Sequence, residues 1–304
     1  MQPLVSIVIP IFNEEASIEP MVQELDRYAP VSCEFIFADD GSTDHSFQVL
    51  ERLAVKDARI RCVSLSRNFG HQYALLAGLH AAAGQQIIIL DGDLQHPPAL
   101  IPAMLEKLEH GFDIVHGLRQ STQDSSPLKR WMASGFYRFI NAISDVRVEP
   151  GAADFKAFTR QVLDELLKFP ERDVFLRGLF SWMGFRQAFL PFDAPARLYG
   201  KSKYSFGQML KLALRGTTSL SFKPLRVALL VGSLISLAAF AFGVFALIAY
   251  FRGETVPGWA SLIIATLLLG GTQLLAIGLL GEYIASLFTE TKQRPRYIVR
   301  RTIN

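Results

Sequence analysis

The chain has 304 residues and a formal net charge of +3, and half of its residues are hydrophobic. The positive charge is concentrated at the end: the part from Phe222 onward carries eight basic and three acidic residues, whereas the preceding part carries 23 and 25. A slightly acidic first part excludes a basic nucleic-acid-binding face there, so no nucleic-acid partner is expected. The mean hydropathy of +0.24 is high for a purely soluble protein and indicates membrane segments.

Strand and helix patterns alternate along the first 120 residues. Short apolar runs predict strands, and longer runs with apolar residues at helical spacing predict helices. The expected strands are Leu4–Ile11, Glu34–Ala38, Ile60–Leu65, Ile87–Leu90 and Asp113–Gly117, and the expected helices are Ser17–Ala29, Asp44–Lys56, His71–Ala83 and Pro98–His110, with Ser17 and Asp44 as N-caps. This alternation predicts an α/β fold whose mostly parallel sheet is flanked by helices. Ligands of such sheets bind beyond the carboxyl ends of the strands.

The stretch Ile87–Pro98, IIILDGDLQHPP, carries the strongest chemical signal. Its apolar run predicts a buried strand, which ends on Asp91 and Asp93. Residues i and i+2 of an extended segment point the same way, so both carboxylates are expected on one side of the strand end. Mg²⁺ and Mn²⁺ take oxygen ligands of this kind, and Mg²⁺ often shares them with substrate phosphates. The competing interpretation is a solvated strand end, because D-x-D also occurs by chance.

Other polar clusters follow the remaining strands at equivalent positions. Asp39, in the tetrad DDGS, suits a nucleobase imide or ribose hydroxyls, although a solvated turn that caps the next helix would have the same sequence. Pro10, Phe12 and Glu14 offer an apolar surface and a hydrogen-bond acceptor to a base. The first strands are followed by neither G-x-G-x-x-G nor a phosphate-loop lysine motif. This disfavours a dinucleotide oxidoreductase and a phosphate-loop NTPase.

Two uncharged runs, Val227–Phe251 and Thr255–Gly281, exceed the ~20 residues that cross a hydrocarbon core. They predict a transmembrane hairpin with Arg252–Pro257 as its turn, and a buried hairpin of core helices is the alternative. Seven of the eight basic residues of this part lie outside the turn, so the positive-inside rule places both chain ends in the cytoplasm. No signal peptide is expected, because Leu4–Ile11 is too short and lacks a basic leader. Tyr204–Phe222 is amphipathic and predicts an interfacial helix.

The motifs IPIFNEE, DDGS, SRNFG, DGDLQHPP and RLYGKSKYS stand in an order that resembles the family 2 glycosyltransferases that load sugars onto polyprenyl phosphates. These include dolichol-phosphate mannosyltransferases and, closer to this chain, bacterial bactoprenol glucosyltransferases with two C-terminal membrane helices. The resemblance covers essentially the whole chain and implies a GT-A type fold, a divalent cation (Mg²⁺ or Mn²⁺), a nucleotide-sugar donor and a polyprenyl-phosphate acceptor. UDP-glucose is the first choice of donor, with GDP-mannose and UDP-N-acetylglucosamine left open. Gly92 stands where Ala is common in the family, a departure expected to be harmless, and Lys201 stands where an acidic residue is common.

The residue patterns and the resemblance together assign roles to particular side chains. The donor and its cation are expected on Pro10, Phe12, Glu14, Asp39, Asp91, Asp93 and Gln95, of which Asp91, Asp93 and Gln95 form the metal set. The acceptor phosphate is expected on Arg119, Arg130, Ser134, Arg197 and Lys203, although residues 197–203 also fit a solvated basic loop. Asp93 and Asp154 are expected to be catalytic. Asp154 carries the family's general-base label, although a phosphate with a second pKa near ~6 is mostly dianionic at neutral pH and needs a base less than a hydroxyl does.

The chain is therefore predicted to contain four parts: a cytoplasmic GT-A domain (1–203), an interfacial amphipathic helix (204–224), a two-helix transmembrane hairpin (225–289) and a basic cytoplasmic tail (290–304). The expected location is the inner membrane, with inverting sugar transfer at its cytoplasmic face, and a homo-oligomer is left open. The competing class is a membrane-anchored nucleotide-binding or scaffold protein, which would be expected to lose Asp91, Asp93 or the basic cluster. A processive polysaccharide synthase is the enzymatic rival, but it typically has more membrane helices and a Q-x-x-R-W motif.

Overall fold

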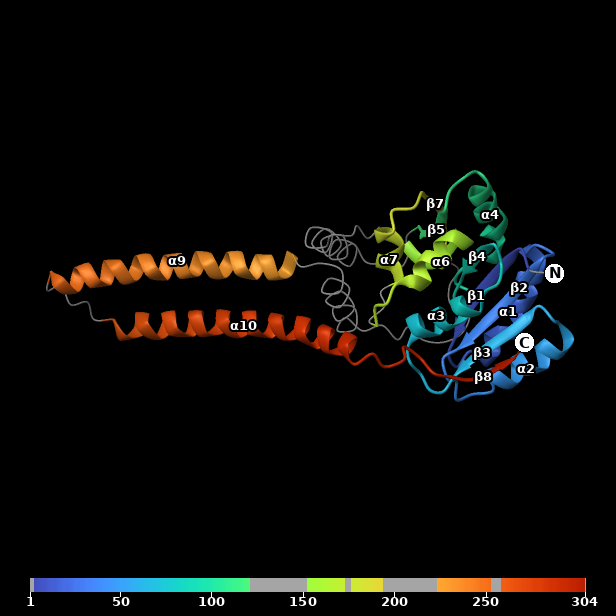
Figure 1. Cartoon of the computed structure of the whole chain (residues 1–304), viewed down its shortest axis with the longest axis horizontal. Helices are drawn as coiled ribbons and strands as arrows, with labels where there is room; N and C mark the ends of the chain where they lie inside the picture. The colour runs from blue at the N-terminus through green and yellow to red at the C-terminus, as the bar shows by residue number, and fades with distance from the viewer. Residues whose placement is uncertain (1–2, 121–151, 173–175, 194–222, 253–257, 304) are drawn as a thin grey trace. The chain divides into compact units, whose positions relative to one another are not determined.

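A computed structural model describes residues 3–120, 152–172, 176–193, 223–252 and 258–303. The chain divides into two compact units (Figure 1). The first comprises Met1–Arg138, Arg147–Ser205 and Gln293–Asn304, and the second comprises Phe139–Val146 and Phe206–Lys292. Each unit is described by itself.

The described part of the first unit is built on an eight-stranded sheet with the order β7-β5-β6-β4-β1-β2-β3-β8. The strands are β1 Val5–Ile11, β2 Cys33–Asp39, β3 Ile60–Leu65, β4 Gln86–Ile89, β5 Ile114–Arg119, β6 Ala152–Thr159, β7 Gln187–Phe192 and β8 Val299–Ile303. Strands β4, β1, β2 and β3 run parallel, as do β5 and β7, whereas β6 is antiparallel to both β4 and β5 and β8 is antiparallel to β3. The mostly parallel α/β sheet predicted from the sequence is confirmed.

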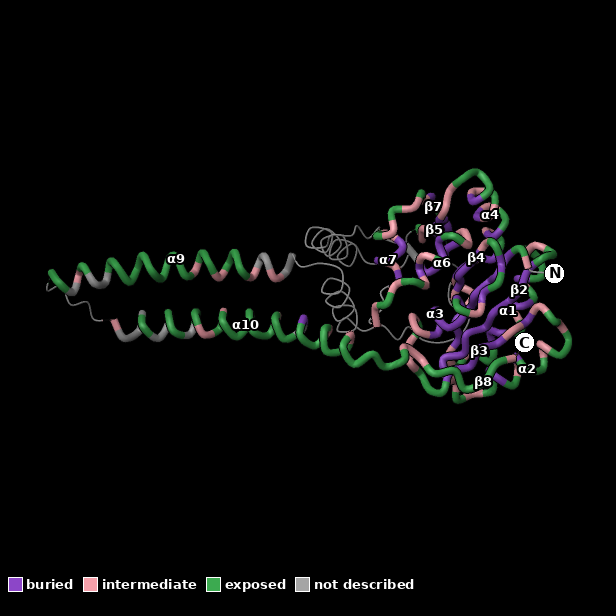
Figure 2. Tube along the Cα trace, in the orientation of Figure 1, coloured by how far each residue is buried: buried purple, intermediate pink, exposed green. Residues whose placement is uncertain are grey.

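Helices cover both faces of this sheet. They are α1 Glu15–Tyr28, α2 Ser46–Lys56, α3 His71–Ala81, the short 3-10 helix η1 Pro98–Leu100, α4 Ile101–Glu109, α6 Arg160–Lys168 and α7 Leu176–Trp182. Alternate residues of β1 belong to different faces: Ile7 and Ile9 pack in a cluster with α1, α2 and α4, whereas Val8 packs with α3, α6 and α7. Both faces of the central strands are therefore buried, which explains why β1, β2 and β4 read as continuous apolar runs (Figure 2).

The first helix begins earlier than the cap pattern predicted. Its N-cap is Glu14, and Ser17 lies inside the helix, where its hydroxyl donates to the Glu14 carbonyl oxygen and to Glu14 Oε2, each at 3.0 Å. The prediction of Ser17 as N-cap was wrong. Asp44 lies one residue before the N-cap of α2, and its carboxylate accepts bonds from the N–H of Ser46 (3.0 Å) and of Glu15 (3.2 Å). One carboxylate thus stabilises the first turns of two helices.

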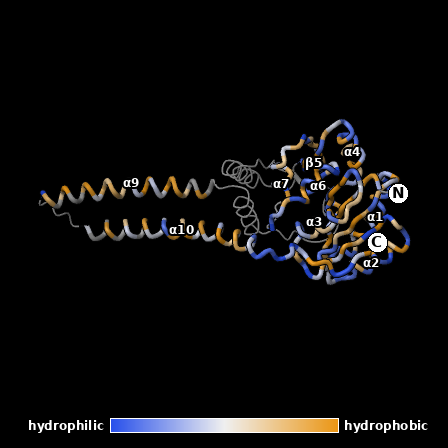
Figure 3. Tube along the Cα trace, in the orientation of Figure 1, coloured by the Kyte–Doolittle hydropathy of each residue, from blue (hydrophilic) through white to orange (hydrophobic). Residues whose placement is uncertain are grey.

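The described part of the second unit consists of two long helices, α9 Lys223–Phe251 and α10 Trp259–Thr291. Each contains a window that is long and apolar enough to cross a membrane, Ala228–Phe245 and Leu268–Thr291, and the apolar positions run along both helices (Figure 3). The described residues of the two predicted apolar segments lie in α9 and α10, and α10 continues ten residues beyond the predicted end at Gly281. The predicted interfacial helix at 204–222 lies outside the described residues.

The C-terminal tail contains a strand that the sequence pattern did not predict. Strand β8 extends the sheet beside β3 (Figure 1). The Arg301 guanidinium lies 3.6 Å from the ring centroid of Phe47 on α2. The residues before β8 are also fastened: Arg172 donates to the Arg294 carbonyl oxygen at 2.5 Å, and Arg296 donates to the carbonyl oxygen of Phe169. The end of the chain after α10 is therefore an integral part of the sheet domain.

Candidate functional site

The loops that follow β1 and β2 interlock at the carboxyl ends of these strands. Asn13 Oδ1 accepts the N–H of Thr43 at 2.8 Å, and the Asn13 N–H donates to the Ser42 hydroxyl at 2.9 Å. Asp39 is 1% exposed; its Oδ1 accepts the Ser42 N–H at 2.9 Å, and its Oδ2 accepts the Ser64 hydroxyl at 2.7 Å. Asp39 thus holds its own turn together, and a role in donor binding, which would use its remaining lone pairs, stays a prediction.

The other residues predicted to face the base lie in the same region. Pro10 is buried within β1 opposite Ala38 of β2, whereas Phe12 and Glu14 are half-buried in the loop that follows. The Glu14 carboxylate accepts a bond from Ser17 of α1, and the Glu14 N–H donates to the Ser46 hydroxyl at 3.0 Å. The structure therefore brings these side chains to the sheet edge at which ligands of this fold class bind.

The DDGS turn also positions the start of α3. Asp40 is buried, and its two oxygens accept the N–H groups of Phe69 (2.7 Å) and Gly70 (2.9 Å). Burial raises the pKa of Asp40. Gly41 has φ +70°, and a Cβ there would lie 2.5 Å from the backbone carbon of Arg67. Only glycine allows this close approach, and the loop is thereby fixed immediately before His71.

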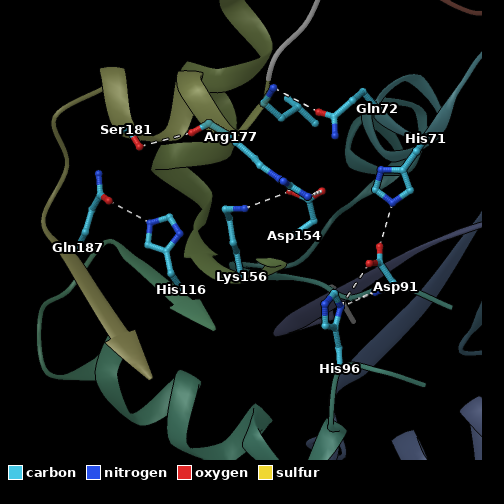
Figure 4. A network of polar contacts seen from close by, with 11 residues as sticks. His71, Gln72, Asp91, His96, His116, Asp154, Lys156, Arg177, Ser181 and Gln187 are labelled. Carbon is cyan, nitrogen blue, oxygen red and sulfur yellow. Dashed lines mark hydrogen bonds and ion pairs between the residues drawn. The ribbon is translucent and has the colours of Figure 1, made fainter. Parts of the chain in front are cut away.

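The end of β4 carries the first predicted carboxylate between two histidines. Asp91 Oδ1 lies 2.9 Å from His71 Nε2, and the Asp91 N–H donates to His96 Nδ1 at 3.0 Å (Figure 4). Because Nδ1 accepts this bond, His96 carries its proton on Nε2 and is neutral; burial lowers its pKa in agreement. Desolvation would lower the pKa of His71, but the hydrogen bond with Asp91 together with the negative charges of Asp91 and Asp154 outweighs this effect and raises the pKa.

The second predicted carboxylate follows in a tight turn. Leu94 has φ +60°, and Asp93 Oδ1 accepts the N–H of Gln95 at 3.1 Å. Asp91, Asp93 and Gln95 therefore belong to one turn at the end of β4. Gly92 lies between the two aspartates against β1, and a Cβ there would be 2.8 Å from Ile11 Cγ2. The i, i+2 argument assumed an extended segment, but Gly92 and Asp93 lie in a turn, so the argument does not apply to this pair. That both carboxylates point to the same side stays a prediction.

Asp154 lies on β6, deeply buried and held by two cations. Arg177 Nε donates to its Oδ1 and Arg177 Nη2 to its Oδ2, both at 2.7 Å, and Lys156 Nζ lies 3.4 Å from Oδ1 (Figure 4). The side chains of Asp154 and Lys156 are 7% and 3% exposed, whereas that of Arg177 is 37% exposed. Burial would raise the pKa of Asp154, but the charges of Arg177 and Lys156 outweigh it and hold the pKa well below its usual range. Burial also lowers the pKa of Lys156.

Sequence reasoning missed the partners of these carboxylates. Lys156 follows Asp154 at i+2 on a strand, so the spacing alone could have placed both on one face. Arg177 is 23 residues further on and His71 is 20 residues before Asp91, and only tertiary packing brings these pairs together. A local signal for these two contacts is absent from the sequence.

Of the residues predicted to bind the acceptor phosphate, Arg119 is the one that lies within the described part of the chain. This residue ends β5 and is half-buried, and its Nε is buried without a hydrogen-bond partner among the described residues. The other predicted acceptor residues, Arg130, Ser134, Arg197 and Lys203, lie outside the described part of the chain. The convergence of these five side chains on one phosphate therefore stays a prediction.

The fold and the site define a class of enzyme. The mostly parallel sheet in which the reversed β6 adjoins β4 is a GT-A type fold, and in this chain carboxylates lie at the end of β4 and on β6. Residues 6–167 match the family described as Glycosyl transferase family 2. The chain belongs to this family and is a glycosyltransferase.

Individual relatives extend this result over the whole chain. The bactoprenol glucosyl transferase of Shigella phage SfX is 37% identical over 300 residues, which cover 97% of this chain and 98% of that protein. Among solved structures, Staphylococcus aureus TarS 1–349 in complex with UDP-GlcNAc is 17% identical with a TM-score of 0.50, covering 72% and 66% of the two chains. The mannosyltransferase PcManGT from Pyrobaculum calidifontis in complex with GDP-Man and Mn²⁺ is 19% identical with a TM-score of 0.47, covering 96% and 87%. Nucleotide sugars are bound in both structures and Mn²⁺ in the second, and the likeness of this chain to the two concerns the fold.

Proposed function

We propose that this glycosyltransferase moves a sugar from a nucleotide-sugar donor, UDP-glucose as first choice, to polyprenyl (undecaprenyl) phosphate at the cytoplasmic face of the inner membrane, with inversion at the anomeric carbon. The observation that carries the proposal is the near full-length similarity to a protein named bactoprenol glucosyl transferase. The two long apolar helices support it, since a lipid acceptor requires access to a membrane. GDP-mannose and UDP-N-acetylglucosamine are the rival donors.

The turn at the end of β4 fits a hard divalent cation. Asp91 and Asp93 offer carboxylate oxygens, and the side chain of Asp91 is 32% exposed. Within the described ranges, no three His, Cys, Asp or Glu side chains gather into a metal cage. This suits a cation that takes its remaining ligands from substrate phosphates and water, as Mg²⁺ usually does. Asp91, Asp93 and Gln95 would hold it, and when bound the cation would neutralise charge on the departing nucleoside diphosphate.

Other residues of the site hold this turn in a fixed orientation. His71 holds one oxygen of Asp91, and His96 accepts the Asp91 N–H, so the carboxylate is fixed from its side chain and from its backbone. Asp40 fixes the loop that delivers His71. The ring of His96 in turn stacks on Phe155 of β6 with 5.2 Å between the ring centroids. The turn is thus attached to the strand that carries Asp154, which favours a single preorganised centre for both carboxylates.

Sugar transfer is tested with the full-length protein reconstituted in vesicles that contain undecaprenyl phosphate. Radiolabelled UDP-glucose, GDP-mannose and UDP-N-acetylglucosamine are supplied separately, and we expect label from UDP-glucose in the lipid extract. Asp91→Asn should abolish this transfer, since losing a group that holds the leaving-group cation costs on the order of several kcal/mol of barrier. Asp164→Asn, at a 56% exposed position on α6, is the matched control and should leave the rate unchanged. Donor binding without transfer of any of the three sugars would favour the nucleotide-binding scaffold instead.

The membrane topology is tested separately. With both chain ends in the cytoplasm, a single cysteine at position 254 should react with an impermeant maleimide added to intact cells, and one at position 304 should react only after lysis. This follows from the excess of basic residues outside the 252–257 connection. The reverse pattern would place the sheet domain on the side opposite to cellular nucleotide sugars and would contradict the proposed reaction.

A further inference from the structure

The contacts of Asp154 suit an anchor for a cation and not a proton acceptor. Both of its oxygens lie 2.7 Å from Arg177 nitrogens, and one of them also lies 3.4 Å from Lys156. This two-point fork is the strongest form of carboxylate–guanidinium pairing. A carboxylate that took up a proton here would leave the buried Lys156 and the paired Arg177 without their counter-charge, which is unfavourable.

The proposed reaction does not need such a proton transfer. An oxygen of the acceptor phosphate forms the new bond to the anomeric carbon while the bond from that carbon to the donor diphosphate breaks. The acceptor changes from a dianionic monoester to a monoanionic diester, and the negative charge that it loses appears on the departing nucleoside diphosphate. The second pKa of a phosphate monoester is near ~6, so the acceptor oxygen is already deprotonated at neutral pH. Charge balances without a base.

Exposure distinguishes the members of this cluster. Asp154 and Lys156 are almost completely buried, whereas more than a third of the Arg177 side chain reaches the surface of the domain. Arg177 is also tied to the centre around Asp91, because the N–H of the preceding residue, Leu176, donates to Gln72 Oε1 at 3.2 Å, and Gln72 adjoins His71 (Figure 4). Arg177 is therefore the accessible member of the cluster, and its helix is bonded to the residue that follows His71.

We propose that Asp154 is a positioning residue for Arg177, and that the guanidinium of Arg177 binds a phosphate oxygen of one of the two substrates. The Asp154 carboxylate orients the Arg177 guanidinium through the two hydrogen bonds. Lys156 stabilises the same carboxylate from within the core, where its Nζ lies 5.5 Å from the ring centroid of Phe180. The low pKa of Asp154 agrees with a carboxylate that stays ionised throughout turnover. This inference rests on the proposed function in that both substrates carry phosphates.

A double-mutant cycle tests the coupling of the two residues in the reconstituted full-length protein. Losing a hydrogen bond to a charged group costs ~1.5–3 kcal/mol, so Arg177→Gln should lower kcat/KM by roughly 10- to 150-fold. If Asp154 acts through Arg177, the variant that combines Asp154→Asn with Arg177→Gln should be within about threefold of Arg177→Gln alone. A general base typically contributes ~10²–10⁴-fold. A further loss of that size in the double variant would overturn the positioning role.

The phosphate that Arg177 binds is identified by two further measurements. A weaker calorimetric affinity for UDP in Arg177→Gln would assign the donor diphosphate, whereas unchanged UDP affinity with a raised KM for undecaprenyl phosphate would assign the acceptor. Unchanged values of both, with only kcat lowered, would overturn phosphate binding. Arg186→Gln, which removes an exposed guanidinium packed on Phe112, is the control for loss of positive charge and should change neither.

Folding and the proposed function have controls of their own. Thermal unfolding curves must show that the single variants fold; if Asp154→Asn does not, Asp154→Glu and Arg177→Lys carry the same cycle with both charges kept. Because lysine cannot form the two-point fork, Arg177→Lys should recover less than a tenth of the wild-type kcat/KM. Absence of transfer by the wild type would contradict the proposed function, and the effect of Arg177→Gln on UDP affinity would still decide whether this residue binds the donor.

Discussion

The buried imidazole of His116 should make the stability of the sheet domain depend on pH in a defined interval. This side chain is 3% exposed on β5, its Nε2 lies 3.0 Å from Gln187 Oε1, and its ring stacks on Phe189 with 5.1 Å between centroids. Burial, reinforced by the charge of Lys156, lowers the pKa of His116 from 6.5 to about 4. The folded domain therefore resists protonation of this ring more than the unfolded chain does.

The size of the effect follows from the difference between the two pKa values. One unit corresponds to ~1.36 kcal/mol, so a difference of about 2.5 units gives roughly 3 kcal/mol. Between pH 6.5 and pH 4 the unfolded chain binds this proton and the folded domain does not. The free energy of unfolding therefore falls as the pH decreases through this interval, and the loss attributable to His116 is complete below about pH 4.

The measurement compares the wild type with His116→Gln by urea denaturation of the full-length protein in a nonionic detergent, from pH 8 to pH 4. At pH 8 the variant should be less stable, because glutamine fills the site incompletely and loses the stacking on Phe189. Toward pH 4 the gap should shrink by roughly 3 kcal/mol, because only the wild type loses the His116 contribution. Carboxylates that titrate in both proteins cancel in this difference. Parallel stability curves would refute the reasoning.

Three further outcomes follow from the structure. Gly41→Ala should lower the free energy of unfolding by more than Gly184→Ala. Both glycines have φ +70°, and left-handed strain alone costs ~1–3 kcal/mol, but the new methyl meets the Arg67 backbone at 2.5 Å only at position 41 and meets open space at position 184. Equal losses would show that the loop after β3 can move away. Gly92→Ala should cost ~1–3 kcal/mol by overpacking against Ile11 and should slow sugar transfer, contrary to the harmless exchange expected from the resemblance, and wild-type stability and turnover would contradict this. Incubation with excess EDTA should abolish transfer and added Mn²⁺ or Mg²⁺ should restore it, whereas full activity in EDTA would contradict a cation on the β4 turn.

The first half of the fold could be predicted because its signals are local. Strands β1 to β5 and the helices between them are runs of fewer than fifteen residues with a clear apolar pattern, and β3 has the predicted bounds, Ile60–Leu65. Strands β6, β7 and β8 could not be predicted from such a local pattern. Strand β6 pairs between β4 and β5 and runs antiparallel to both. Strand β8 is a strand only because it pairs with the edge strand β3, which is more than 200 residues away in the sequence. Pairing at such separations is tertiary information.

The candidate site divides in the same way. Asp91 and Asp93 could be found from their position after an apolar strand, and the comparisons confirm the class of enzyme that this position indicates. What the side chains do depends on partners from other elements. Asp39 was predicted to face a ligand, and the sequence did not show that each of its oxygens also accepts a bond within the domain. Asp154 was labelled a base without knowledge of the two cations that hold it. Spacing identifies which residues reach an edge but not which groups meet them there.

The C-terminal strand also constrains the membrane topology without reference to charge. A bilayer cannot lie between two strands that share backbone hydrogen bonds, so β3 and β8 are on the same side of any membrane. The chain between them must therefore cross an even number of times. A single crossing by α9 or by α10 is excluded, whereas two crossings satisfy the rule. If both helices cross, the positive-inside rule has to decide only the side on which β3 and β8 lie. Thr302→Pro disrupts the pairing of β8 with Val63 of β3 and leaves every basic residue in place, so a change of topology in that variant would show that β8, and not the charge pattern alone, holds the domain on its side of the membrane.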